Sequence, residues 1–149
     1  MSMISILRIN IQDTLYQQER ELRNKVLMQP IGMPDYGWEQ FDSKSWHFVA
    51  IDNKRKVVGC VVLVPNVNQR HDAQLIQMAV DESYQGKGVG KLLVEELETF
   101  AKTHEISTIL CHSRDKAVNF YLKLNFEIYD EPFEEAGIIH RYMRKYLEE

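Results

Sequence analysis

The chain has few cysteines and no long apolar run. Cys60 and Cys111 are its two cysteines, too few and too widely separated for a disulfide framework or a cysteine-based zinc site. Both lie in apolar, strand-like runs, where a buried free thiol is the expected state. Free thiols favour a reducing cytoplasm as the default compartment. Because no apolar run is long enough to cross a bilayer, we expect no membrane partner. Because the two cysteines cannot form a zinc site, we also expect no metal centre.

Concentrated positive charge is also missing. The 149 residues carry 18 Lys and Arg against 22 Asp and Glu, a formal net charge of -4. A nucleic-acid partner is therefore not expected, since binding a duplex calls for a dense basic face that displaces phosphate counterions. Only seven Gly and four Pro occur, which excludes collagen-like and low-complexity chains. The length is that of one compact domain with a substantial core, spanning residues 1–149.

Hydrophobic periodicity predicts an α+β fold with a mixed, largely antiparallel central sheet flanked by helices. Apolar and β-branched runs predict strands, and apolar residues at helical spacing predict three helices. The expected order is strand 4–9, helix 12–27, strands 46–51, 57–64 and 73–80, a helix ending near 103, strand 107–112, a short helix near 117–124, and strands 126–129 and 138–146.

A glycine-rich segment, Gln85-Gly86-Lys87-Gly88-Val89-Gly90, joins a predicted strand to a predicted helix. Backbone N–H groups in the first turn of a helix have no intrahelical partner, and the helix dipole favours negative charge there. Glycines let a phosphate approach those amides closely, so the segment has the chemistry of a pyrophosphate cradle.

The spacing excludes a P-loop, because Gly90-Lys91 is followed by Leu92 and the first-glycine position holds Gln85. A dinucleotide fingerprint needs a third glycine where Lys91 stands. A tight helix entry with no ligand stays open as the plain structural alternative.

The remaining pattern, Gln85, Gly88 and Gly90 in Gln-x-x-Gly-x-Gly, resembles the acyl-CoA signature of the GNAT superfamily of N-acetyltransferases. The block from Ala117 to Phe126 looks like the second common motif of that family, and the order of strands and helices matches the GNAT fold over nearly the whole chain.

The resemblance implies an acetyl-CoA-dependent transferase, one N-acetyltransferase domain over 1–149, that acetylates a primary amine by direct attack in a ternary complex. Acetyl-CoA would be the cosubstrate, and a homodimer is one option for the assembly. Tyr121 matches the tyrosine that protonates the departing thiolate or orients the sulfur, and a purely structural place in the core is the less favoured alternative. The cofactor-binding residues implied are Met78, Ala79, Val80, Gln85, Gly86, Lys87, Gly88, Val89 and Gly90.

The resemblance does not supply a general base. Gln74 and Ile109 stand where relatives carry carboxylates, and neither can accept a proton. His112 is one of several titratable residues without an assigned role, and Arg114 stands where the family usually has Asn. A weakly catalytic acyl-CoA sensor or scaffold therefore remains an alternative to an enzyme, and the acceptor is not identified. Tyr36, Trp38, Phe41 and Trp46 are candidates for an acceptor wall.

Overall fold

A computed structural model describes residues 3–65 and 71–148 and confirms the α+β layout. The order of strands and helices is the order that the sequence predicts. The elements are β1 Ser5–Ile9, α1 Tyr16–Arg23, η1 Asn24–Met28, η2 Gln29–Ile31, η3 Asp42–Lys44, β2 Trp46–Ile51, β3 Val57–Pro65, β4 Asp72–Val80, η4 Glu82–Tyr84, α2 Val89–Thr103, β5 Thr108–Arg114, η5 Asp115–Ala117, α3 Val118–Lys123, β6 Glu127–Glu135 and β7 Ile138–Tyr146.

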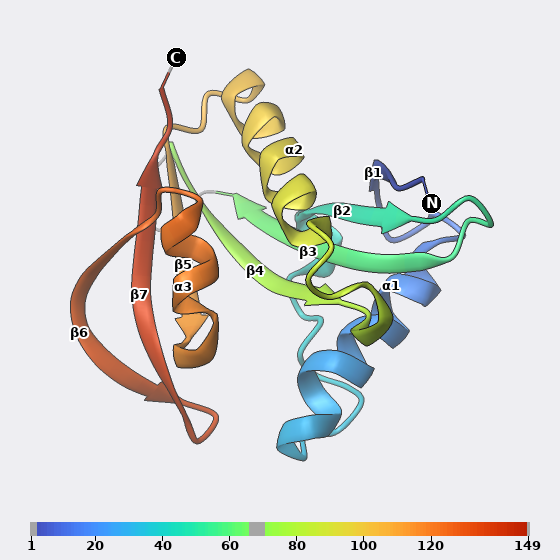
Figure 1. The fold of residues 1–149 in the computed structure, drawn as a ribbon, viewed down its shortest axis with the longest axis horizontal. Helices are drawn as coiled ribbons and strands as arrows, with labels where there is room; N and C mark the ends of the chain where they lie inside the picture. Colours follow the sequence, from blue (N-terminus) through green and yellow to red (C-terminus); the bar gives the residue numbers. More distant parts are fainter. Residues whose placement is uncertain (1–2, 66–70, 149) are drawn as a thin grey trace.

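The seven strands form one sheet in the order β1-β2-β3-β4-β5-β7-β6, shown in Figure 1. Each neighbouring pair is antiparallel except β4 and β5, which are parallel and are connected through α2. A parallel pair needs a crossover connection, and the helix α2 supplies it. The sheet is therefore largely antiparallel, as expected from the sequence.

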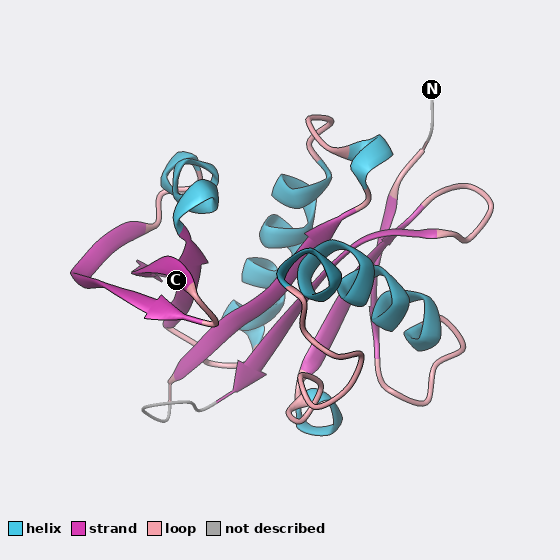
Figure 2. Cartoon of the chain, turned by 90° about the horizontal axis from the view of Figure 1, so that it is seen from below, coloured by secondary structure: helices cyan, strands magenta, loops and turns pink. Residues whose placement is uncertain are grey.

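Helices cover both faces of the sheet, as Figure 2 shows. Leu93, Leu97 and Ala101 of α2 pack with inward residues of β2, β3 and β5 in the larger core. Leu22 of α1 packs on the opposite face in a smaller core that includes Val49. Each face of the sheet is thus buried against a different helix, which fixes the position of α1 and α2.

Strands β4 and β5 separate halfway along their length. Their pairing runs from Asp72 opposite Thr108 to Leu75 opposite Cys111, and each strand then continues without the other. A bulge also interrupts the pairing of β3 with β4, where Gln77 has a φ of 55°. A bulge leaves backbone groups outside the ladder and bends the strand. The outer halves of β4 and β5 therefore splay apart.

The predicted helix over 12–27 is only partly right. The α-helix covers Tyr16–Arg23, and a π-helical segment, Asn24–Met28, continues it. The Asn10 side chain accepts a hydrogen bond from the Gln12 amide, and residues before Tyr16 form turns. Such local side-chain bonds compete with helix formation. The apolar spacing therefore located the helix but not its start or its wide final turns.

The predicted strand over 126–129 is too short. Strand β6 continues to Glu135, and its pairing with β7 shifts register between Tyr129 and Phe133. Pro132 lies inside this irregular stretch and lacks an N–H for the ladder. In the fold the proline therefore sits in a bulge that bends one longer edge strand.

A buried ionic cluster connects α1 to the segment before β2. The Arg23 guanidinium donates to Glu19 Oε2 at 2.7 Å and to Asp42 Oδ2 at 2.8 Å, and all three side chains are buried. The His47 ring lies between two acceptors, with Nδ1 2.9 Å from Glu19 Oε2 and Nε2 2.9 Å from the Asp42 carbonyl oxygen. Two acceptors require two N–H groups, so the imidazole is the protonated form.

Burial alone would lower the pKa of His47, but the hydrogen bond and the charge of Glu19 outweigh it, so the net pKa is raised. With His47 protonated, two cations balance the two carboxylates. Neutral pairing inside a nonpolar region is the arrangement that buried charges need.

We expect His47→Gln to lower the free energy of unfolding by about 3 kcal/mol near pH 6, because it removes one of the two cations of the buried cluster and leaves two carboxylates against the Arg23 guanidinium alone. The raised pKa means that folded His47 holds its proton more tightly than the unfolded chain does. Its contribution is full below the unfolded pKa of about 6.5 and is lost as pH rises through the folded pKa, by up to about 1.4 kcal/mol per pH unit.

Urea unfolding of parent and variant between pH 6 and pH 9 (the approximate range in which a histidine proton is lost) measures this difference. The gap between the two proteins should shrink as pH rises. The exposed His71, changed to Gln, provides the control and should give a gap that stays flat. A His47→Gln gap that widens with pH would contradict the assigned protonation.

Gly59 on β3 sets how closely α2 approaches the sheet. A Cβ built on Gly59 would lie 2.8 Å from Val89 Cγ1 and 3.1 Å from Leu93 Cδ1. Both distances are shorter than ordinary van der Waals contact, so α2 can begin where it does only because residue 59 lacks a side chain.

Gly59→Ala should therefore destabilise the fold by about 1–3 kcal/mol through overpacking. Val89→Ala removes the methyl group that the new Cβ meets, so the double variant should be more stable than the sum of the two single effects by more than about 0.5 kcal/mol. Pairing Gly59→Ala with Leu97→Ala, farther along the same helix, should give additive losses. Additivity in both pairs, measured by urea unfolding, would show that α2 is not held by this contact.

Candidate active site

The glycine-rich turn begins with two side-chain caps. Asp81 accepts a hydrogen bond from the Ser83 amide at 3.0 Å, and these Ser83 bonds lower the pKa of the Asp81 carboxyl. Gln85 Nε2 donates to the Val80 carbonyl oxygen at 3.0 Å. The opening glutamine of the motif thus fastens the turn back onto the end of β4.

Gly86 and Gly88 both have left-handed backbone conformations, with φ of 78° and 82°. Gly88 is the N-cap of α2, whose first-turn amides follow it directly. A Cβ at either glycine would have no protein atom within 4 Å, so open space lies in front of the turn. Unpaired amides, the positive end of the helix dipole and that open space fit an anionic phosphate ligand.

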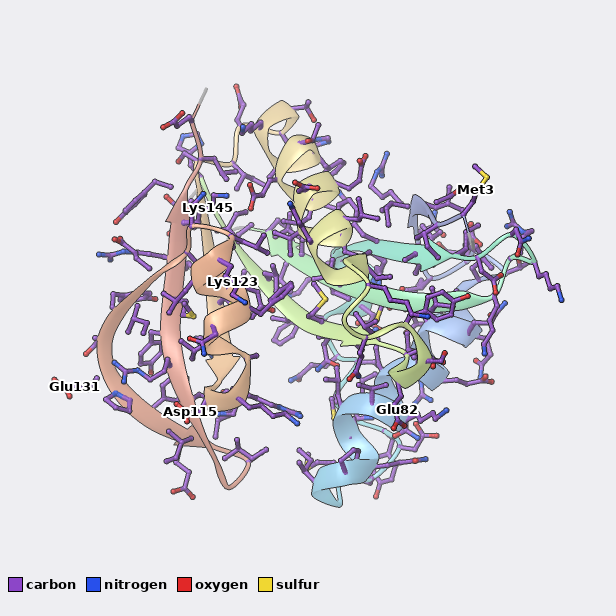
Figure 3. The ribbon with its side chains drawn as sticks, in the orientation of Figure 1. Met3, Glu82, Asp115, Lys123, Glu131 and Lys145 are labelled. Carbon is purple, nitrogen blue, oxygen red and sulfur yellow. The ribbon has the colours of Figure 1, made fainter. Side chains whose placement is uncertain are left out.

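A cleft of about 1010 Å³ runs from this turn into the gap between β4 and β5. Nearly all the predicted cofactor-binding residues line it, together with the predicted acid: Met78, Ala79, Val80, Gln85, Gly86, Gly88, Val89, Gly90 and Tyr121. In Figure 3, Asp115 and Lys123 mark the α3 side of the splayed sheet, and Glu82 marks the turn on the other side. The fold therefore brings residues far apart in sequence into one cleft.

Lys87 is the exception among the predicted cofactor-binding residues. Its side chain is not among those that line the cleft, and its ammonium lies 5.5 Å from the centre of the Tyr84 ring. The position of the lysine in the motif placed it beside the cradle, but a side chain at a turn can point away from the backbone amides on which the motif depends.

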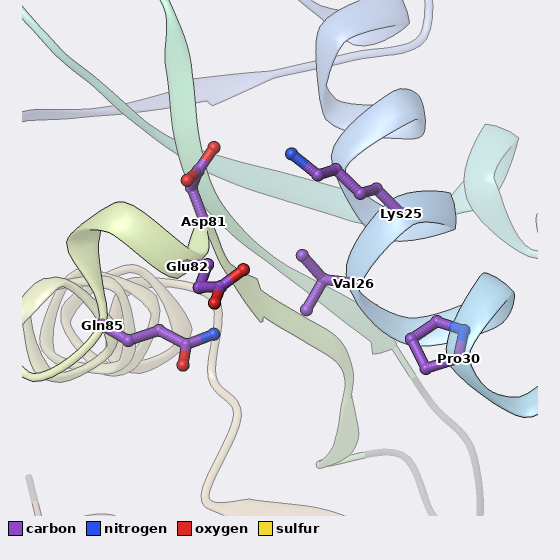
Figure 4. A pocket seen from close by; sticks show the side chains of 6 residues that line it. All are labelled: Lys25, Val26, Pro30, Asp81, Glu82 and Gln85. Atoms are coloured by element: carbon purple, nitrogen blue, oxygen red, sulfur yellow. The ribbon is translucent and has the colours of Figure 1, made fainter.

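A smaller pocket of about 260 Å³ adjoins the cleft. Figure 4 shows Lys25, Val26 and Pro30 on one side of it and the acidic turn residues Asp81 and Glu82, with Gln85, on the other. Val26 and Gln85 line both spaces, so the pocket continues the cleft between η1 and the turn.

Tyr121 lies at the cleft and in the core at once. Its side chain is 4% exposed and its ring packs edge-on against Phe120 and Phe126. Burial raises the pKa of its phenol well above the usual value, and the neighbouring Cys111 thiol adds to the rise. The phenol is therefore fully protonated at neutral pH and is able to donate a proton.

The two positions that relatives fill with carboxylates lie apart here. Gln74 lines the cleft, whereas Ile109 is fully buried in the core. Arg114 also lines the cleft, and its Nη2 donates to the Leu27 carbonyl oxygen at 3.0 Å. This bond crosses from β5 to η1, and burial lowers the pKa of the Arg114 guanidinium.

Two of the four aromatic candidates for an acceptor wall lie at the cleft. Trp38 and Phe41 line the cleft. Trp46 instead packs against Phe100 on the α2 side of the sheet, and Tyr36 is 71% exposed. The four were grouped because they lie close along the chain, but alternation along β2 turns Trp46 toward α2, on the face of the sheet away from α1.

Some cleft residues carry no signal that the sequence analysis used. Gln77 lies at the bulge, and Glu135 and His140 come from β6 and β7. A bulge has no reliable sequence signal, and Glu135 lies beyond the end of the strand predicted over 126–129. His140 could have been found from its place on the same predicted face of the last strand as Tyr142.

Glu19, Asp42 and His47 offer ligand atoms within 4.8 Å of one another, the spacing of a metal site. The guanidinium of Arg23 already bonds to both carboxylates of this group. A metal ion there would meet a fixed positive charge, so the cluster fits a structural role better than metal binding. No helix in the described part of the chain is both long and apolar enough to span a membrane.

The fold and the site can be compared with known proteins. Escherichia coli ElaA superposes with a TM-score of 0.79 at 18% identity, covering 96% of this chain and 99% of that one. An acyl-CoA N-acyltransferase from Pseudomonas aeruginosa gives a TM-score of 0.81 at 17% identity, covering 96% and 99%. An aminoglycoside 6'-N-acetyltransferase complexed with coenzyme A gives 0.79 at 15% identity, covering 97% and 98%. At these identities the likeness concerns the fold.

Sequence comparison gives a nearer relative over a shorter span. The Bacillus subtilis protein YyaT is 33% identical over 75 residues, which cover 50% of this chain and 51% of YyaT. The chain thus matches about half the length of this relative. The model of the GNAT acetyltransferase domain matches residues 17–147, from α1 through β7. This protein therefore belongs to the GNAT family of acetyltransferases.

Proposed function

We propose that this protein transfers an acetyl group from acetyl-CoA to a primary amine of a small molecule or peptide, with residues 1–149 as one N-acetyltransferase domain. The observation that carries the proposal is the continuity of the cleft, which joins the glycine turn, the splayed strands and Tyr121. The two free cysteines, both buried, are consistent with a cytoplasmic enzyme.

The amides around Gly86 to Gly90 would hold the pyrophosphate of the cosubstrate, since first-turn amides have no intrahelical partner and open space lies in front of Gly86 and Gly88. The bulged segment of β4 around Met78 would offer backbone groups to the pantetheine arm and to the thioester carbonyl. A backbone N–H directed at a developing oxyanion stabilises the tetrahedral intermediate of acyl transfer.

Direct attack by the amine fits the cleft better than an acyl-enzyme. Cys111 is the thiol beside the cleft, and burial raises its pKa to about 12. It is therefore not a thiolate nucleophile at neutral pH. The amine would attack the thioester carbon, the C–S bond would break, and Tyr121 would donate its proton to the departing thiolate. The nitrogen would lose one proton as the amide forms, and that proton would restore the phenol.

The first test of the cradle is Gly88→Glu, which should abolish coenzyme A binding by placing a negative charge beside the pyrophosphate. Because Gly88 has a φ of 82°, any side chain there also strains the backbone, by about 1–2 kcal/mol. Gly88→Ala carries that strain without the charge and serves as the matched control.

Isothermal titration with coenzyme A should show no binding to Gly88→Glu and weakened binding to Gly88→Ala. Thermal unfolding should show similar stability losses in both variants. Equal affinities in Gly88→Glu and the parent protein would place the cosubstrate elsewhere. Absence of binding to the parent would leave the glycine turn as a structural helix entry.

Tyr121→Phe tests the proposed acid. The variant keeps the buried ring, so we expect little loss of stability and little change in coenzyme A affinity. Single-turnover acetyl transfer should fall by roughly a hundredfold, within the usual range of a general acid. Single turnover is the proper measurement, because product release can mask a slower chemical step. A parental rate in the variant would make Tyr121 a core residue only.

An amine panel with the parent protein separates an enzyme from an acyl-CoA sensor. Turnover on any panel amine supports the transferase, whereas tight coenzyme A binding with no transfer to any amine favours the sensor.

A further inference from the structure

Three titratable side chains from three strands meet at the cleft wall. His112 Nδ1 on β5 lies 3.6 Å from Glu135 Oε1 on β6, and His140 Nε2 on β7 lies 3.7 Å from Glu135 Oε2. All three residues line the large cleft. The pairing of Arg114 with His140 and of His112 with Tyr142 places them on one face of the sheet.

A hydrogen bond fixes the orientation of the His140 ring. Its Nδ1 lies 2.8 Å from the Ile138 carbonyl oxygen, which can only accept, so Nδ1 carries a hydrogen. The nitrogen that faces Glu135 is then Nε2, and His112 faces the other oxygen of the same carboxylate. The two imidazoles therefore share one carboxylate at the cleft wall.

The His112 ring packs against two aromatic rings and remains partly exposed to solvent. It packs edge-on against Phe133 at 5.2 Å and Tyr142 at 5.1 Å between ring centres, and its side chain remains 34% exposed. With Nδ1–H toward Glu135, the lone pair on Nε2 is available to a ligand, and the carboxylate stabilises the imidazolium that forms.

The charged and titratable groups around His112 come from each neighbouring element. Glu135 on β6 and the pair His140 and Tyr142 on β7 face it, and Arg114 on its own strand and Lys116 of η5 line the same part of the cleft. Glu135 favours the imidazolium, and the two cations oppose it, so the described surroundings carry both signs.

Alternation along β5 separates this cluster from Tyr121. Cys111 belongs to the core beneath α2 and α3 with Tyr121, and the next residue, His112, points to the opposite face. The gap between β4 and β5 lies between the two. A thioester in the gap would then have the acid Tyr121 on the α3 side and the proton acceptor His112 on the opposite face, from which the amine attacks.

We propose that His112 accepts a proton from the ammonium form of the acceptor, with Glu135 and His140 as positioning residues that stabilise the resulting imidazolium. This inference rests on the proposed acetyl transfer. One proton leaves R-NH3+ for His112 and later passes to solvent. The free amine then forms the C–N bond, and the C–S bond breaks. Tyr121 gives its proton to the thiolate, and the second proton that the nitrogen loses restores the phenol.

The test uses two probe amines of nearly equal shape with different basicity. Benzylamine is protonated at pH 7, whereas phenylhydrazine, with its terminal nitrogen at the same distance from the ring, is not. Benzylamine must therefore lose a proton before it can attack the thioester, whereas phenylhydrazine can attack as it is. Trp38, Phe41 and Phe120 line the cleft and suit an aromatic probe.

His112→Gln should lower single-turnover acetyl transfer to benzylamine by about a hundredfold and to phenylhydrazine by less than about fivefold. The benzylamine rate of the variant should continue to rise at alkaline pH until the amine itself loses its proton. Coenzyme A affinity should not change. A merely structural role for His112 would instead lower both rates together.

Glu135→Gln provides a second variant whose folding is not in doubt, because the Glu135 side chain is 54% exposed. It should lower the benzylamine rate by about tenfold, with the same sparing of phenylhydrazine. Glu134→Gln is the matched control, since Glu134 pairs with Ile139 on the opposite face and should leave both rates unchanged.

Equal losses on both amines, or no loss on benzylamine, would overturn the assignment of His112 while leaving the acetyl transfer itself intact. A parent protein that binds coenzyme A and transfers to neither probe nor to any panel amine would remove the proposed function, and this inference with it.

Discussion

Strands β4 and β5 exchange hydrogen bonds only as far as Leu75 and Cys111, and each then continues alone. Parallel strands that lose their partner leave backbone N–H and C=O groups that need other partners. The cleft of about 1010 Å³ opens where this pairing ends. The glycine turn follows the free end of β4, and α3 follows the free end of β5. Interrupting one pair of strands thus places every element of the site.

A gap in a sheet must be held open by contacts elsewhere. On the β4 side, α2 is held against the sheet through the close approach of Val89 to Gly59. On the α1 side, the buried pairing of Arg23 with Glu19 and Asp42 fixes α1 to the segment that carries Trp38 and Phe41. The cation–π contact of Arg23 with Trp38, at 4.8 Å, extends that hold to the cleft wall. Electrostatics and close packing therefore support the two walls separately.

The sequence was sufficient for the order of elements and for the position of the glycine turn. Periodicity locates buried faces, and Gly86 and Gly88 occupy backbone conformations that other residues rarely adopt. It was insufficient where a local rule was overridden by the fold. The predicted strand over 126–129 stopped short of the bulge through which β6 continues, and the apolar spacing before Met28 gave no sign of a π-helix.

The cluster around Glu135 shows why the candidate site was only partly predictable. Its three members lie 23 and 28 positions apart along the chain when counted from His112 to Glu135 and to His140. Neither histidine stands in a recognisable motif, and their meeting depends on the register of β7 against both neighbours. Motifs report contacts made within a short segment, whereas such a cluster requires the register of three strands.

The protonation states on the two sides of β5 differ for a physical reason. Tyr121 and Cys111 lie in the core, where burial opposes their ionised forms and raises both pKa values. A buried phenol can donate a proton, but burial destabilises the phenolate that remains. The phenolate should therefore regain a proton quickly from the reacting nitrogen. His112 faces the open cleft beside a carboxylate, where a cation is stabilised. Strand β5 thereby separates the proposed donor, on α3, from the proposed acceptor, on the opposite face of the strand, so that each can act from its own side of the cleft.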